Sequence, residues 1–159
     1  MKISVARAVD ALPIARMSRV LIEHDLPWSW TETRVRHSIL HSETAAIVAK
    51  DGRRMAGFAI MRFFDDRAHL NLLAVLPAYR GRGIGRELVE WLEACARTAG
   101  IFDIKLELRS SNTAARGFYE NLGYTFSGHV RGYYAGREDA LRMQRNLSVL
   151  PTPLGGRSN

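Results

Sequence analysis

A short glycine-rich segment is the part of the sequence best suited to binding an anion. Gly81, Gly83 and Gly85 alternate with other residues directly before an apolar pattern that has the spacing of a helix. Glycine lets the backbone approach a ligand closely, and the unpaired N–H groups at a helix N-terminus favour phosphate oxygens. Three arginines add positive charge around the loop: Arg80, Arg82 and Arg86. The pattern predicts a site for a phosphate or diphosphate group.

The spacing of these glycines does not fit two common phosphate-binding motifs. A P-loop requires Gly-x-x-x-x-Gly-Lys-Ser/Thr, and no lysine lies near the loop. The dinucleotide-binding pattern requires Gly-x-Gly-x-x-Gly and opens its fold, whereas this loop follows several other elements. A glycine-rich turn that serves only as the entry to a helix is the structural alternative.

A carboxylate in the middle of a strand is a second candidate for chemistry. Residues 103–109 alternate apolar and polar side chains, which places Glu107 on the polar face with Lys105 and Arg109. A strand with a parallel neighbour is commonly buried on both faces, so Glu107 is expected either in an ion pair or in a cleft. Because burial penalises the charged form, we expect the pKa of Glu107 to be raised, which would make it a better base.

The surrounding pattern predicts the elements that hold these residues. It predicts strands at 3–7, 44–50, 55–64, 68–76, 103–109, 124–130 and 140–145. It predicts helices from Asp10 to about Leu21, over about 30–41 with a Ser29–Glu32 capping box, from Ile84 to near Gly100, and from Asn112 to Leu122. A strand–helix–strand order at 68–109 requires a parallel pair, and the hairpins require antiparallel pairs. The expected fold class is α/β, a mixed central sheet of about seven strands flanked by about four helices.

Composition limits the class of protein. The 159 residues are 47% hydrophobic, enough for a real core, and the single cysteine cannot form an intrachain disulfide. No apolar run approaches the roughly 20 residues of a membrane-spanning helix, and no secretory signal is visible. The formal net charge of +7 comes from scattered residues without a basic run, so nucleic acid is not the expected partner. We expect a cytoplasmic protein with no membrane partner, with one domain over 1–147 and a flexible tail over 148–159.

Three stretches resemble the GCN5-related N-acetyltransferase (GNAT) family. Residues 80–85 have the Arg-x-x-Gly-x-Gly form of the family's pyrophosphate loop, and residues 73–79 resemble the strand and turn that precede it. Residues 112–124 resemble the family's second motif, an Asn-capped helix that carries a tyrosine and ends in Gly-aromatic. The resemblance covers residues 70–125 and implies a single-domain GNAT fold that uses acetyl-CoA and no metal.

The resemblance also implies a role for each matched position. Tyr119 would be the acid that protonates the departing CoA thiolate, and Glu107 matches the proton acceptor of RimI-type enzymes within the family. The coenzyme would lie between strands 70–76 and 103–109, with the Val75 amide donating to the oxyanion. The residues implied to bind the coenzyme are Leu73, Ala74, Val75, Arg80, Gly81, Arg82, Gly83, Ile84, Gly85, Arg86 and Asn112. A core tyrosine packed beside Phe118 is the structural alternative for Tyr119.

Within the family, three shorter stretches are similar to RimI-type enzymes, which acetylate the N-terminal alanine of a ribosomal protein. These stretches are residues 26–29, 106–112 and 131–140. Two positions depart from that pattern, because His69 or its neighbours and Leu76 stand where acidic residues are common. The resemblance implies a primary amine as acceptor, most simply a protein α-amino group such as a ribosomal protein N-terminus. With a pKa of about 7.7–8.0, that group needs only a modest base.

Two other functions fit the same sequence. A GNAT enzyme could acetylate a small-molecule amine or amino acid, or the chain could be a non-catalytic CoA-binding or nucleic-acid-binding regulatory module. His37 and His41 lie four apart on one predicted helix, but no carboxylate or cysteine near them completes a metal site. Trp28 and Trp30, between the first two helices, could anchor the core or floor an acceptor groove.

Overall fold

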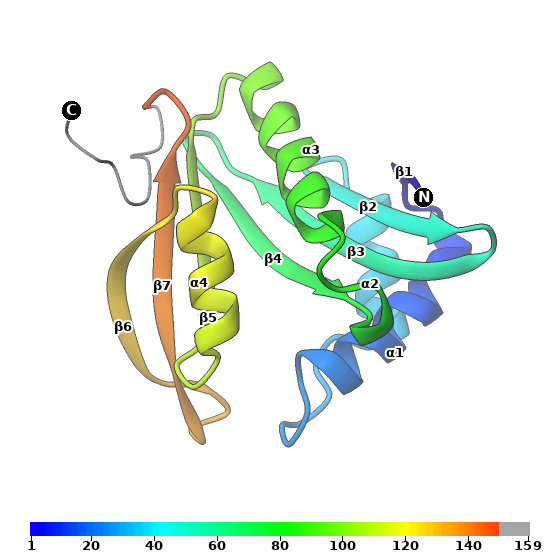
Figure 1. Ribbon diagram of the computed structural model, residues 1–159, viewed down its shortest axis with the longest axis horizontal. Coiled ribbons are helices and arrows are strands. Elements are labelled where there is room, and N and C mark those ends of the chain that lie inside the picture. Colours follow the sequence, from blue (N-terminus) through cyan, green and yellow to red (C-terminus); the bar gives the residue numbers. More distant parts are fainter. Residues whose placement is uncertain (150–159) are drawn as a thin grey trace.

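A mixed sheet with the strand order β1-β2-β3-β4-β5-β7-β6 runs through the molecule, and the computed structural model describes residues 1–149 (Figure 1). Its strands are β1 (Lys2–Val5), β2 (Thr44–Asp51), β3 (Arg54–Phe63), β4 (Ala68–Val75), β5 (Asp103–Arg109), β6 (Thr125–Tyr134) and β7 (Glu138–Asn146). Its helices are α1 (Ala11–Leu21), α2 (Glu32–Leu40), α3 (Ile84–Thr98) and α4 (Thr113–Asn121), with short 3-10 turns at Ala8–Asp10 and Pro77–Tyr79. These elements confirm the expected α/β fold with a mixed sheet of seven strands.

The sheet is antiparallel except where β4 meets β5. These two parallel strands pair only over residues 68–70 and 104–106. Beyond that point they diverge, and a wedge-shaped gap opens between them (Figure 1). Within residues 1–149, the remainder of β4 therefore has β3 on one side and no strand on the other. A strand edge left open in this way presents unpaired backbone groups.

A β-bulge at Asn71 reverses the two faces of β4. The neighbouring β3 residues Ile60 and Met61 pair with Leu72 and Leu70, so Asn71 is an extra residue in the ladder. Before the bulge, Leu70 belongs to the core under α3. After it, Leu72 belongs to the core under α1 and α2. The bulge thus changes which side chains reach each face along a single strand.

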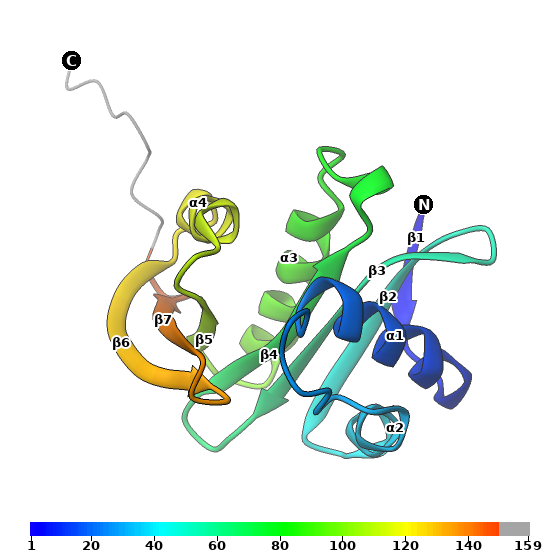
Figure 2. The same cartoon turned by 90° about the horizontal axis from the view of Figure 1, so that it is seen from below.

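Two hydrophobic cores cover the two faces of the sheet. Figure 2 shows α3 and α4 on one face and α1 and α2 on the other. The core under α3 and α4 includes Leu88, Leu92, Leu106, Leu108, Tyr119 and Tyr124. The core under α1 and α2 includes Ile14, Val35, Val48, Phe58, Ile60 and Leu72. Because Leu106 and Leu108 face α3 and α4, the residue between them in β5 faces the α1/α2 side.

The start of α2 differs from the expected capping box. Thr31, and not Ser29, is the N-cap, since its side chain accepts the Arg34 amide at 3.4 Å. The Ser29 hydroxyl instead donates to the buried carboxylate of Glu23, which also accepts the amide of Trp30 at 3.2 Å. The Ser29 hydroxyl is therefore bonded to Glu23 and does not cap α2. The same carboxylate holds the loop between α1 and α2 through the hydrogen bonds of Ser29 and Trp30.

The last hairpin is longer than expected, because Tyr134 and Glu138 still pair across its tight turn. Of the tail expected at 148–159, residues 150–159 lie outside the described residues. No helix within residues 1–149 is both long and apolar enough to cross a membrane.

Candidate active site

The open edge of β4 aims particular backbone groups into the gap. The Leu76 amide donates to the Ala56 carbonyl at 2.8 Å, so this residue turns its backbone groups toward β3. In an antiparallel pair the direction alternates, so Ala74 also turns toward β3, whereas Leu73 and Val75 turn toward the gap. The sequence predicts that residues 73, 74 and 75 all pair with the coenzyme, and this alternation reduces the set from three residues to two. Leu73 and Val75 are the two whose N–H and C=O groups face the gap.

The glycine loop lies at the N-terminus of α3 and leaves its amides uncapped. Gly81 and Gly83 have positive φ angles of 77° and 80°, a conformation that favours glycine. Gly83 is the N-cap and has no side-chain cap, and α3 then begins at Ile84. A Cβ on Gly85 would lie 3.2 Å from ring carbons of Phe118, so this glycine lets α3 and α4 approach. The loop has the form of an anion cradle.

The other residues expected around the coenzyme also have protein partners. Asn112 caps α4, because its side chain accepts the Ala115 amide at 3.0 Å. The arginine contacts are Arg80 Nε to the Val75 carbonyl at 3.2 Å, Arg82 over the Tyr79 ring at 5.2 Å, and Arg86 Nη1 to Glu90 at 3.4 Å. Three cationic groups therefore surround the loop, and one of them braces the end of β4.

On the α1/α2 face, two cationic side chains hold the carboxylate of Glu107. Its side chain is 8% exposed, and Oε1 accepts from Arg142 Nε at 3.0 Å. Its Oε2 contacts Nε2 of His69, whose Nδ1 contacts the side-chain oxygen of Asn71. Since both ring nitrogens of His69 face acceptor oxygens, the doubly protonated imidazolium is favoured. Glu107 is therefore in an ion pair with Arg142, and its role as proton acceptor stays a prediction.

The expected upward pKa shift of Glu107 is wrong. Burial does raise the pKa, but the hydrogen bonds and charges of His69 and Arg142 outweigh it and hold the pKa below the usual 4.5. Burial lowers the pKa of His69, but hydrogen bonds to Glu107 and Asn71 outweigh this effect and raise that pKa above 6.5. The histidine is therefore the member of the pair that titrates closer to neutral pH.

The Tyr119 side chain lies on the other face of the sheet, within the core under α3 and α4. Its ring meets Phe118 and Tyr124 edge-on, with centroids 5.0 and 5.6 Å away. Burial raises the pKa of Tyr119 far above 10, with a smaller contribution from Tyr134, so the hydroxyl keeps its proton at neutral pH. The pKa of Tyr134 is also raised, mainly by burial, then by Tyr133 and then by the charge of Glu107. The phenol of Tyr119, which keeps its proton, and the carboxylate of Glu107 therefore lie on opposite faces of the sheet.

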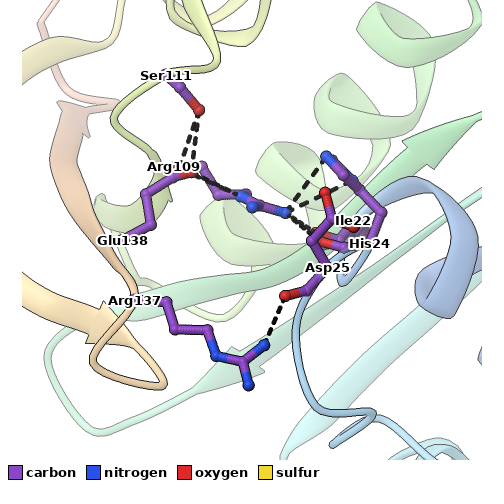
Figure 3. A network of polar contacts seen from close by, with 7 residues as sticks. All are labelled: Ile22, His24, Asp25, Arg109, Ser111, Arg137 and Glu138. Atoms are coloured by element: carbon purple, nitrogen blue, oxygen red, sulfur yellow. Dashed lines mark hydrogen bonds and ion pairs between the residues drawn. The ribbon is translucent and has the colours of Figure 1, made fainter.

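The loop between α1 and α2 is tied across to β5 and β7 (Figure 3). Arg109 Nη1 donates to the His24 carbonyl at 2.7 Å, while its Nε pairs with Glu138 at 3.2 Å. Arg137 Nη1 donates to the Asp25 carbonyl at 2.9 Å. These contacts connect the two arms of the divided sheet on the side that Glu107 faces.

Comparison with known proteins identifies the family. Residues 16–124 match the model of the Acetyltransferase (GNAT) family. The chain belongs to the GNAT family. The [ribosomal protein bS18]-alanine N-acetyltransferase of Salmonella typhimurium is 35% identical over 143 residues, which are 82% of this chain and 97% of that protein.

Solved structures agree with this assignment. The crystal structure of the ribosomal-protein-S18-alanine N-acetyltransferase from Escherichia coli has a TM-score of 0.79 and 31% identity, covering 96% of this chain and 97% of that one. An aminoglycoside 6'-N-acetyltransferase complexed with coenzyme A has a TM-score of 0.76 and covers 96% of this chain and 99% of that one. At 21% identity it shows the shared fold alone.

As a GNAT acetyltransferase, this protein uses acetyl-CoA and needs no metal. The cradle at Gly81–Gly85 and the open edge of β4 fit such a cosubstrate, since one offers amides to a diphosphate and the other offers backbone groups to amides. Within residues 1–149 no group of three or more His, Cys, Asp or Glu could hold a metal ion.

Sequence reasoning about this acetyltransferase missed the partners of Glu107. Arg142 lies opposite Glu107 in the β5–β7 register, and His69 lies opposite Lys105 in the short β4–β5 pairing. Both placements depend on strand registers that the sequence does not specify locally. The available signal was the departure at His69 from the acidic residue common in similar enzymes.

Proposed function

We propose that this GNAT enzyme transfers the acetyl group of acetyl-CoA to a protein N-terminal α-amino group, as the names of its bS18-alanine N-acetyltransferase relatives state for those proteins. The observation that carries the proposal is the placement of Glu107 and Tyr119 on opposite faces of the divided sheet. An amine that enters from the α1/α2 side can meet a thioester that lies along β4. A cytoplasmic location belongs to the same proposal, because ribosomal proteins are made there.

On the amine side, the proposed work of Glu107 is to orient the α-ammonium group and accept its proton. An ammonium group has no lone pair, so this proton must leave before the nitrogen attacks the acetyl carbon. With His69 charged, two cations hold the Glu107 carboxylate and make it a weak proton acceptor. Loss of the His69 proton removes one of these cations and strengthens the acceptor.

On the thioester side, the proposed work falls to Val75 and Tyr119. The Val75 N–H faces the gap and donates to the carbonyl oxygen as it becomes an oxyanion. When the new N–C bond has formed and the C–S bond breaks, the Tyr119 hydroxyl gives its proton to the thiolate. The nitrogen loses two protons in all: Glu107 passes the first to solvent before the attack and takes the second as the C–S bond breaks, and exchange with solvent then returns a proton to Tyr119 and removes one from Glu107.

The test is an acceptor panel that follows thiol release and acetylated product together. Peptides that begin with alanine, their N-terminally blocked forms, and small amines are each incubated with acetyl-CoA. We expect acetylation of the unblocked peptides, and a fall of about 10²-fold or more for Glu107→Gln. Glu120→Gln is the matched control, because Glu120 is an exposed carboxylate of α4 that pairs with Arg116.

Three results would contradict the proposal. Turnover of small amines without peptides would favour the small-molecule enzyme. Binding of CoA without thiol release from any acceptor would favour a non-catalytic module. Equal activity of Glu107→Gln and the unaltered enzyme would assign proton removal to another group.

A further inference from the structure

A groove with a cationic lining lies on the α1/α2 face next to the proposed proton acceptor. Its volume is about 410 Å³. It is lined by Trp30, Thr31, Thr33, Arg34, His37, Ser38, His41, Thr44, Arg62 and Asn71. No aspartate or glutamate is among these residues. The proposed chemistry of acetyl transfer uses none of the four basic side chains.

The walls of the groove come from α2 and from one end of the sheet. Arg34, His37 and His41 are supplied by successive turns along and just after α2. Arg62 is the partner of Thr44 in β2 on one side and of His69 in β4 on the other. Directly paired residues share a face, so Arg62 lies on the same face as the imidazole that contacts Glu107.

The two arginines of the groove have no acidic partner among residues 1–149. Arg34 lies over the Trp30 ring at 3.8 Å, and Arg62 lies near the Phe64 ring at 5.2 Å. By contrast, Arg36 on the same helix pairs with a neighbouring glutamate. Arg34 Nη1 also donates to the Ser29 carbonyl at 3.5 Å. Aromatic contacts hold the two guanidinium groups in place, and their other N–H donors are available to an anion.

The groove is within reach of an extended peptide whose N-terminus lies at Glu107. Arg62 stands on the second strand from Glu107, and neighbouring strands lie about 4.8 Å apart. Arg62 is in register with His69 and Lys105, and Glu107 lies two residues further along β5, so the two are separated by roughly 12 Å. An extended chain advances about 3.3 Å per residue, so roughly three to four residues cover that distance. A side chain near the third or fourth position of the acceptor can therefore enter the groove.

We infer that the groove is an acceptor subsite that binds an acidic side chain near the third or fourth residue of the protein N-terminus. The inference rests on the proposed function and adds a substrate preference to it. Arg34 and Arg62 bind the carboxylate, and Trp30 supplies an apolar wall for the stem of that side chain. Trp30 packs against the core under α1 and α2 and also lines the groove, so the structure supports its role as a core anchor while the inference adds a role at the acceptor.

The test compares alanine-initiated peptides that are identical except for one residue. A single glutamate or its neutral isostere glutamine is placed in turn at positions two to five of an uncharged hexapeptide. We expect glutamate to lower KM by about 3- to 10-fold at position three or four, because exposed ion pairs are individually weak. The difference should shrink as salt concentration rises.

Variants then show whether the groove causes the preference. Arg34→Gln combined with Arg62→Gln should remove the difference in KM between the two peptides. Arg36→Gln is the matched control on the same helix and should keep the preference. A thermal melt confirms that each variant is folded.

The outcomes separate this inference from the proposed function. Equal use of both peptides, or a preference that survives in the double variant, overturns the subsite alone. Failure to acetylate any peptide despite CoA binding overturns the proposed function and the subsite with it. Retention of an RNA oligonucleotide by the groove, without any glutamate preference, overturns the subsite by assigning the arginines to phosphates.

Discussion

The imidazole of His69 and the carboxylate of Glu107 are in contact at the point where β4 and β5 begin to diverge. The two residues are 38 positions apart in the chain, and the short parallel pairing of the two strands brings them together. Because Asn71 and Arg142 hold the outer sides of the pair, neither partner can turn away without losing another contact. The proton-accepting strength of Glu107 is therefore coupled to the charge of one histidine.

The pH dependence of turnover should move when this histidine is replaced. At saturating peptide, kcat should fall as pH drops through the pKa of His69, which lies above 6.5. In His69→Gln this fall should shift to lower pH, because the remaining ionisation belongs to Glu107, whose pKa is ordinarily 4.5. Measuring kcat from pH 5 to 9 checks this, with His129→Gln as the exposed-histidine control. An unshifted profile would mean that the two groups are not coupled in catalysis.

The same pair predicts a pH window for stability. The lowered pKa of Glu107 stabilises the fold above about pH 4.5 and loses effect as pH falls through the folded-state pKa. The raised pKa of His69 stabilises the fold below about pH 6.5 and loses effect as pH rises through the folded-state pKa. Both contributions are present between these two values.

Urea denaturation of the unaltered protein and of His69→Gln measures this window. We expect the difference in free energy of unfolding to be about 1–2 kcal/mol near pH 5.5 and smaller at pH 8.5. His129→Gln should show a smaller difference, because that side chain is 49% exposed. A difference that grows toward pH 8.5 would contradict the assigned direction of the His69 shift.

Removal of one buried phenol hydroxyl should separate chemistry from packing. Tyr119→Phe should lower kcat by about 10²-fold or more and leave the KM for acetyl-CoA nearly unchanged, because only the proton donor is lost. Tyr124→Phe is the matched control, since its hydroxyl donates to the buried Glu93 at 3.0 Å. It should lower the melting temperature with little change in kcat. If both variants show the same pattern, the Tyr119 hydroxyl has only a packing role.

Local patterns in the sequence were sufficient to predict the glycine loop before α3 and the polar face of β5. The glycine spacing and the alternation in 103–109 involve neighbouring residues only, so strand and helix geometry determine the outcome. The resemblance at 112–124 likewise placed Asn112 at the start of α4, where its side chain accepts a backbone amide.

Contacts between residues far apart in the chain could not be predicted from local sequence patterns. The bulge at Asn71 decides which face the β4 side chains reach, and no local pattern marks it. From the sequence, burial alone predicts a raised pKa for Glu107. In the structure, two strand registers bring His69 and Arg142 to the carboxylate, and these cations lower its pKa instead. Ser29 and Glu32 have the spacing of a capping box, but the Ser29 hydroxyl donates its hydrogen bond to Glu23 instead.

Charge in the glycine loop should affect coenzyme binding more than shape does. Gly83 has a φ of 80°, and a Cβ there would meet nothing within 4 Å, so asparagine and aspartate both fit equally. Gly83→Asp adds a negative charge beside the diphosphate, and its Kd for CoA should rise about 10²-fold above that of Gly83→Asn. Calorimetric titration measures both variants. Equal Kd values for the two would place the diphosphate elsewhere.

The tie between Arg109 and the α1–α2 loop should affect the acceptor and not the coenzyme. The guanidinium group reaches the His24 carbonyl with Nη1 and the Glu138 carboxylate with Nε (Figure 3), and a lysine has no such fork. Arg109→Lys should therefore raise the KM for peptide by about 5- to 50-fold with an unchanged KM for acetyl-CoA. Arg137→Ala breaks only the contact to Asp25 and should have a smaller effect in the same direction.

Arg116→Lys is the matched control for this prediction, because Arg116 is an exposed arginine of α4 that pairs with Glu120. The loop that Arg109 holds leads into Trp30 and the groove, so loosening it should cost acceptor binding first. If Arg109→Lys instead raised both KM values equally, the network would be holding the two arms of the sheet at the right separation for the coenzyme. The ratio of the two KM changes therefore identifies which side of the gap the network serves.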